Sequence, residues 1–90
     1  MDMRRLVGRN VKKARLDRGI TQEQFAEASG FTQQYISGLE TGRRNPTILS
    51  LFELAQALGV EHMVLVAPDE QAGEESRKRQ TRSRRKQGSE

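Results

Sequence analysis

The stretch that decides the fold runs from residue 21 to residue 42 and reads TQEQFAEASGFTQQYISGLETG. Thr21 is a good N-cap, and Gln24 completes the capping-box pattern, in which a Gln or Glu stands three residues after the cap. A helix is therefore predicted over residues 22–28. Gly30 follows it at a point where a tight turn can require positive φ. The first half of the stretch predicts a short helix and then a turn.

A second short helix is predicted directly after this turn. Thr32 caps it, it covers residues 33–41, and Gly42 ends it. Ala26 is small where the two helices would cross, so their backbones can approach closely, and Ile36 would tie the second helix to the core. Two short capped helices joined by a tight turn are the pattern of a helix-turn-helix.

The outward side of the second helix carries polar, uncharged side chains at Gln33, Gln34, Ser37 and Thr41. A face that only maintains solubility more often carries Lys and Glu. A Gln amide can donate to adenine N7 and accept from adenine N6 in the major groove. Gln33 and Gln34 are therefore predicted to contact bases. Ser37 could reach a base or a phosphate, and Thr32 could touch a thymine methyl group while its hydroxyl caps the helix.

Apolar residues elsewhere predict further helices and an all-α domain over residues 1–69. One helix is expected over 4–18, and a later one ends at Gly59. The later helix has its apolar stripe at Ile48, Leu51, Leu54, Ala55 and Leu58. Residues 61–66 are apolar but too short for periodicity to distinguish a helical turn from an extended segment.

The charge of the chain is distributed unevenly. The formal net charge is +4 over 90 residues, and the whole excess falls in residues 74–90, which hold seven basic and three acidic residues. Residues 70–90 have no apolar periodicity, so they are predicted to be a disordered basic tail. Such a tail could add phosphate contacts, recruit another protein, or be a dispensable extension.

The composition argues against several functional classes. The chain has no cysteine and a single histidine, His62, so neither a metal site nor thiol or histidine catalysis is expected. No phosphate-binding glycine loop or carboxylate dyad is apparent, and no cofactor is expected. No run of apolar residues is long enough to span a membrane. The expected protein is therefore a cytoplasmic non-enzyme.

The stretch from about Val7 to Val66 resembles the DNA-binding domain of lambdoid phage repressors and Cro proteins, the XRE family. The matching residues are Arg15, Gly19, Ile20, Thr21, Gln22, Phe25, Ala26, Gly30, Thr32, Gln33, Gln34, Ile36, Leu39, Glu40, Gly42, Pro46 and the run LAQALGV at 54–60. The resemblance implies a five-helix lambda-repressor-like domain and double-stranded DNA as the partner. Controller proteins of restriction-modification systems, phage regulators and some antitoxins share this arrangement.

The resemblance also implies roles for particular residues. Gln22 matches a glutamine that binds a backbone phosphate, and Arg15 and Glu40 match a partly buried ion pair. Further candidates for phosphate contacts are Tyr35, Thr41, Arg43 and Arg44. The alternatives are solvated surface side chains, ordinary packing for Tyr35, and two unrelated charges for the pair. Gly38 departs from the family, because relatives often place a base-reading side chain there.

Proteins of this kind usually bind inverted repeats as two-fold dimers, with half-sites about one helical turn apart. The candidate dimer interface is Met63, Val64 and Val66, with Phe52 and Leu58 as further candidates, whereas Leu65 could fill the core of the monomer.

The resulting hypothesis is a sequence-specific transcriptional regulator, a dimeric repressor or autoregulator that excludes RNA polymerase from an operator or contacts it beside the promoter. One alternative is an antitoxin whose main role is to neutralise a protein partner. Another is a nonspecific nucleic-acid binder that works through its tail, in which case deleting residues 74–90 would abolish binding.

Overall fold

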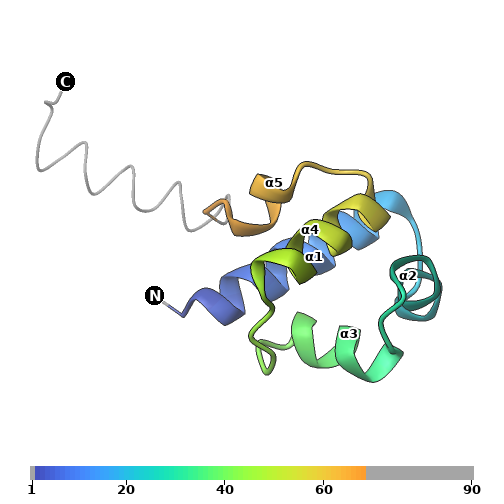
Figure 1. Ribbon diagram of the computed structural model, residues 1–90, viewed down its shortest axis with the longest axis horizontal. Helices are drawn as coiled ribbons and strands as arrows, with labels where there is room; N and C mark the ends of the chain where they lie inside the picture. The colour runs from blue at the N-terminus through green and yellow to red at the C-terminus, as the bar shows by residue number, and fades with distance from the viewer. Residues whose placement is uncertain (1, 69–90) are drawn as a thin grey trace, which may run out of the picture.

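The structure is a computed structural model that describes residues 2–68, which form five α-helices and no strand (Figure 1). The helices are α1 (Met3–Arg18), α2 (Gln22–Ser29), α3 (Gln33–Glu40), α4 (Ile48–Leu58) and α5 (His62–Val66). The all-α prediction is confirmed. The predicted disordered tail, residues 70–90, lies outside the described residues, as does the boundary predicted at residue 69.

The helices begin and end within a residue of their predicted positions. Thr21 and Gln24 form both hydrogen bonds of the capping box, with Gln24 N donating to Thr21 Oγ1 at 3.0 Å and Thr21 N to Gln24 Oε1 at 2.9 Å. α3 ends at Glu40, one residue earlier than predicted, and Thr41 is its C-cap. Residues 62–66 are helical, which decides between the two alternatives for that segment.

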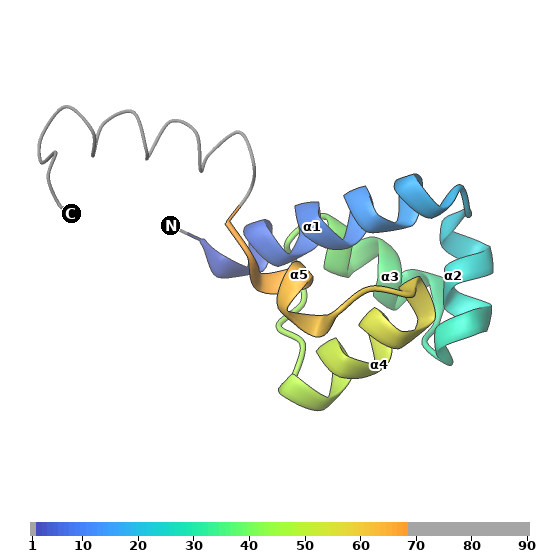
Figure 2. The same cartoon turned by 90° about the horizontal axis from the view of Figure 1, so that it is seen from above.

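The core lies where α1 meets α3, α4 and α5, with α2 packed against α3 and α4 (Figure 2). The largest fully buried side chains are Val11, Phe25, Ile36, Leu39, Leu54 and Leu65. Burying an apolar side chain of this size contributes about 1.5–3 kcal/mol relative to leaving it exposed. Every helix contributes at least one of them, so all five are held to one centre.

One predicted core position is wrong. Ile48 was expected on the buried stripe of its helix, but it is 86% exposed, and its neighbour Leu49 is 71% exposed. The buried part of α4 starts later, at Leu54, and Leu51 is only half-buried. The spacing of apolar residues shows which side of a helix is apolar. It does not show how many turns of that helix pack against a neighbouring element.

The backbones of α1 and α3 touch at Gly8. A Cβ atom at this position would collide with the carbonyl oxygen of Leu39 and lie 2.9 Å from that of Glu40. Only a glycine lets α1 lie this close to the C-terminal turn of α3. The contact fixes the end of α3 directly against α1.

Polar side chains of α1 fasten the C-terminal ends of the two last helices. Asn10 Nδ2 donates to the carbonyl oxygens of Leu65 and Ala67 at 3.0 and 2.7 Å, and Arg18 Nη1 donates to that of Leu58 at 3.1 Å. Carbonyls at a helix C-terminus lack partners within the helix, and the side chains of α1 bind those of Leu58 and Leu65 and that of the C-cap Ala67.

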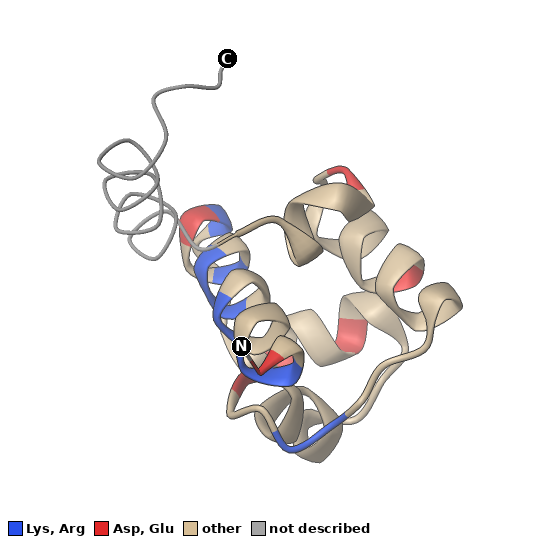
Figure 3. Ribbon diagram, turned by 90° about the vertical axis from the view of Figure 1, so that its left-hand side faces the viewer, with Lys and Arg blue, Asp and Glu red and all other residues tan. Residues whose placement is uncertain are grey.

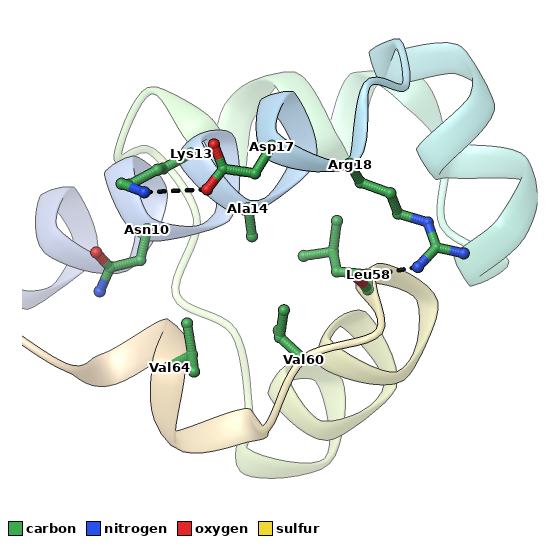
Figure 4. A pocket seen from close by; sticks show the side chains of 8 residues that line it. All are labelled: Asn10, Lys13, Ala14, Asp17, Arg18, Leu58, Val60 and Val64. Atoms are coloured by element: carbon green, nitrogen blue, oxygen red, sulfur yellow. Dashed lines mark hydrogen bonds and ion pairs between the residues drawn. The ribbon is translucent and has the colours of Figure 1, made fainter.

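An open hollow lies between α1 and the segment from Leu58 to Val64 (Figure 4). Its lining residues are Asn10, Lys13, Ala14, Asp17, Arg18, Leu58, Val60 and Val64. Lys13 and Asp17 form an ion pair of 3.0 Å at its rim. Among residues 2–68, no helix combines the length and apolar character that crossing a bilayer requires.

Candidate nucleic-acid interface

The turn between α2 and α3 is built from local hydrogen bonds. Gly30 has φ 83°, in the left-handed region that favours glycine, and its N–H donates to the carbonyl oxygen of Ala26 at 2.9 Å. The hydroxyl of Ser29 accepts from Phe31 N at 3.3 Å, and that of Thr32 accepts from Tyr35 N at 3.0 Å. The turn therefore ends one helix and starts the next without an unsatisfied cap.

Two buried side chains decide which side of α3 faces outward. Ile36 and Leu39 have no exposed surface, so the opposite side of the helix faces solvent. Gln33, Gln34 and Ser37 are all exposed there. Within residues 2–68, the amides of Gln33 and Gln34 have no hydrogen-bond partner, so their donors and acceptors are available to another molecule.

A buried ion pair fixes the inner side of α3. Arg15 Nε lies 2.7 Å from Glu40 Oε2, and Arg15 Nη2 lies 3.1 Å from Glu40 Oε1, so the guanidinium holds the carboxylate with two hydrogen bonds. The two side chains are only 10% and 3% exposed. Arg15 Nη1 also donates to the carbonyl oxygen of Ile20 at 2.9 Å. The pair joins α1 to α3 at the end of the candidate recognition helix.

Gln22 belongs to the same hydrogen-bond network. Its Nε2 donates to Glu40 Oε1 at 3.1 Å, which links the start of α2 to α1 and α3. An amide nitrogen has two hydrogens. One is therefore used inside the protein, and the other remains for the phosphate contact predicted for Gln22.

The remaining predicted phosphate contacts follow the C-terminal part of α3. Thr41 is exposed, but its hydroxyl donates to the carbonyl oxygens of Ser37 and Gly38 at 3.0 and 3.1 Å, so a phosphate would receive this hydrogen only if the hydroxyl turned. Arg43 is exposed and its backbone N–H donates to Gly38 O at 2.8 Å. Arg44 is also exposed, and its guanidinium lies over the ring of half-buried Tyr35.

The structure adds two basic residues that sequence reasoning did not include. Arg5 lies beside Gly42, because a Cβ at Gly42 would be 2.9 Å from Arg5 Cγ. The first turn of α1 therefore borders the loop that carries Arg43, and the side chains of Arg4 and Arg5 are 55% and 74% exposed. Figure 3 places Lys and Arg along α1 and in this loop. The sequence around residues 4 and 5 does not indicate that they lie close to the loop after α3.

The predicted dimer residues do not all share one face. Met63 and Val66 are 66% and 38% exposed, while Val64, 45% exposed, lines the hollow beside α1. Leu58 is only 3% exposed and belongs to the core, so the suggestion that it joins an interface is wrong. Leu65 is fully buried.

Other exposed apolar side chains lie on α4, the helix that packs against α5. Phe52 is 45% exposed and its ring lies 6.1 Å from that of His62, at the start of α5. The exposed apolar side chains of these two helices outside the hollow are together named the apolar patch; they are Ile48, Leu49, Phe52, Met63 and Val66. Exposed apolar side chains on two packed helices are candidates for a contact with another protein surface.

No group of three or more His, Cys, Asp or Glu side chains that could hold a metal ion occurs in the part of the chain that the structure describes.

Comparison with known proteins identifies relatives of one kind. A family model described as helix-turn-helix matches residues 11–65. The HTH-type transcriptional regulator y4dJ of Sinorhizobium fredii, described as uncharacterized, is 58% identical over 71 residues, which are 79% of this chain and 92% of that protein.

Solved structures agree in fold. The restriction-modification controller protein C.AhdI of Aeromonas hydrophila superposes with a TM-score of 0.67 at 32% identity, over 69% of this chain and 90% of that one. The controller protein C.Esp1396I, solved as a tetramer in complex with its natural 35 base-pair operator, gives a TM-score of 0.67 at 38% identity, over 72% of this chain and 86% of that one.

Proposed function

The chain belongs to the XRE family of helix-turn-helix transcriptional regulators, and on this basis we propose that it is a dimeric, sequence-specific repressor or autoregulator. The observation that carries this proposal is the outer face of α3. Its amides at Gln33 and Gln34 are exposed and have no hydrogen-bond partner within the described residues, while the inner side of the same helix is fixed by a buried ion pair.

A polar, uncharged helix face whose inner side is held by a buried ion pair suits the major groove. Gln33 and Gln34 lie in the first turn of α3, and residues at the start of a recognition helix are those that reach base edges in this motif. Ser37 lies one turn further along on the same side. We assign base contacts to these three residues and to the methyl group of Thr32.

Phosphate contacts would surround this face. The second amide hydrogen of Gln22, beside the N-terminus of α2, suits an anion, since helix N-termini favour negative charge. Arg43 and Arg44 follow α3, with Tyr35 and Thr41 next to them. Phosphate contacts of this kind fix the register of the protein on the duplex but do not read its sequence.

A single recognition helix contacts only a few base pairs, so the proposal includes a two-fold dimer on an inverted repeat. Half-sites would then lie about 34 Å apart, one turn of the duplex. The apolar patch is the surface available for this dimer. The operator-bound C.Esp1396I is a tetramer, which supports an oligomer as the DNA-binding form.

Bound to such an operator, the dimer would exclude RNA polymerase from an overlapping promoter or contact it from an adjacent site. The protein would act in the bacterial or phage-infected cytoplasm, on the nucleoid, without a cofactor and without catalysis.

The proposal predicts a selective loss of affinity when Gln33 is replaced by Ala. Removing one bidentate amide–base contact should weaken operator binding by about 1–3 kcal/mol and leave binding to random duplex almost unchanged. Fluorescence anisotropy with both duplexes at one salt concentration measures the two losses.

Gln56→Ala is the matched control, because Gln56 is an exposed glutamine on α4; it should alter neither affinity. Arg43→Ala should weaken both duplexes alike and lower the salt slope by about one, as expected for one phosphate contact. Equal losses on both duplexes for Gln33→Ala would contradict base reading by this residue.

A further inference from the structure

Gly38 is an unusual residue for its position. It lies within α3, one turn after Gln34 on the outer side. A glycine in the interior of a helix lowers the stability of that helix relative to an alanine. Its backbone does not need glycine, because the positive φ angles among the described glycines occur at Gly19, Gly30, Gly42 and Gly59. The feature that sets this position apart is the space beside it.

The space beside Gly38 is occupied by the side chain of Arg44. A Cβ atom at position 38 would lie 3.2 Å from Arg44 Cγ, 3.2 Å from Arg44 Nε and 3.7 Å from Arg44 Cδ. The stem of Arg44 therefore crosses α3 directly over the glycine. A methyl group there would press against this stem rather than against backbone.

The guanidinium of Arg44 lies over an aromatic ring. Its Cζ atom lies 5.5 Å from the centroid of the Tyr35 ring, within the range of a cation–π contact. Tyr35 itself stacks on Phe31, with ring centroids 4.7 Å apart and planes at 16°. Phe31 and Tyr35 are both half-buried and pack against the core, which holds the ring under the guanidinium in place.

We propose that Gly38 is a positioning residue for DNA binding: it admits Arg44 across α3, so that a guanidinium stacked on Tyr35 meets a phosphate at the edge of the groove. The inference rests on the function proposed above and deepens it. A freely rotating Arg loses side-chain entropy when it binds a phosphate, whereas a side chain already held in place loses less. The glycine thus makes room for a pre-positioned cation.

The test compares Gly38→Ala, Arg44→Ala and the double variant in the full-length protein, titrated against operator and unrelated duplex over a range of salt concentrations. Gly38→Ala should weaken both duplexes by about 2- to 10-fold, the cost of immobilising one long side chain. If Gly38 acts through Arg44, the double variant should bind as Arg44→Ala alone does.

A structural readout accompanies the titration. In the wild type, NMR signals of the Arg44 side chain should carry a ring-current shift from Tyr35, and this shift should shrink in Gly38→Ala. The melting temperature of Gly38→Ala should not fall, because alanine favours the helix. A weakened variant with an unchanged melting temperature separates positioning from folding.

Two results would overturn the inference. In the first, Gly38→Ala binds both duplexes as tightly as the wild type. In the second, the double variant loses the sum of the two single losses, which would mean that the new methyl group clashes directly with the duplex. A wild-type protein that binds neither duplex would instead refute the proposed function itself, so the two failures are distinguishable.

Discussion

Replacing Arg15 by Met is expected to lower the free energy of unfolding by about 3–5 kcal/mol, because it leaves the buried carboxylate of Glu40 without its charge partner. Methionine keeps much of the apolar stem, so the loss reports the charge rather than a cavity. Each kcal/mol lowers the melting temperature of a domain of this size by roughly 4–8 °C. Urea unfolding followed by circular dichroism measures the loss.

Two further variants make this test specific. The double variant Arg15→Met with Glu40→Leu removes both charges and should recover most of the stability, as apolar replacements of buried pairs often do. Lys13→Met breaks an ion pair on the same helix whose side chains are 64% and 66% exposed, and it should change stability by less than about 1 kcal/mol. A loss for Arg15→Met as small as that for Lys13→Met would mean that the pair does not hold α3.

Replacing Met63 by Glu is expected to lower operator affinity by about 100- to 10,000-fold, the gain that two linked binding sites usually provide. Met63 is 66% exposed, so the new carboxylate stays in water in the monomer. In a two-fold interface the same patch meets itself, so the substitution would bring two charges into an apolar contact. The dimer should therefore dissociate while the domain stays folded.

Sedimentation and operator titration together test this expectation. The wild type should sediment as a dimer and Met63→Glu as a monomer with an unchanged melting temperature. Leu16→Glu is the matched control, since Leu16 is 57% exposed on α1, outside the apolar patch; it should stay dimeric. A Met63→Glu protein that remains dimeric and keeps its operator affinity would show that another surface forms the dimer.

Local features of the chain were predictable because local chemistry determines them. Thr21 with Gln24 and Thr32 provide caps whose partners lie within one helical turn, so their hydrogen bonds follow from spacing alone. Gly30 follows from the steric freedom that its turn requires. The direction of α3 follows from Ile36, whose burial turns the amides outward.

Features that depend on distant parts of the chain were not predictable. The need for glycine at position 8 arises only from the packing of α1 on α3. The sequence predicted a phosphate contact for Arg44 but not the contact between its stem and Gly38. Asn10 gives no sign in the sequence that it caps the end of α5. The exposure of Ile48 likewise depends on where the neighbouring helices end.

The pairing of Arg15 with Glu40 was implied by family resemblance, and the structure brings the two side chains together. The third member, Gln22, was expected only at a phosphate, yet its amide also binds Glu40. The family pattern describes only the phosphate contact of Gln22. It therefore could not predict that the same amide also donates a hydrogen bond inside the protein.

The most direct test of base reading by Gln33 and Gln34 is selection of bound duplexes from a random pool by the full-length protein. We expect an enriched inverted repeat with half-sites about 10 base pairs apart, and a variant with alanine at both positions should lose the enrichment within each half-site. A protein that binds DNA but leaves the pool random, or a double variant that enriches the same sequence, would contradict it.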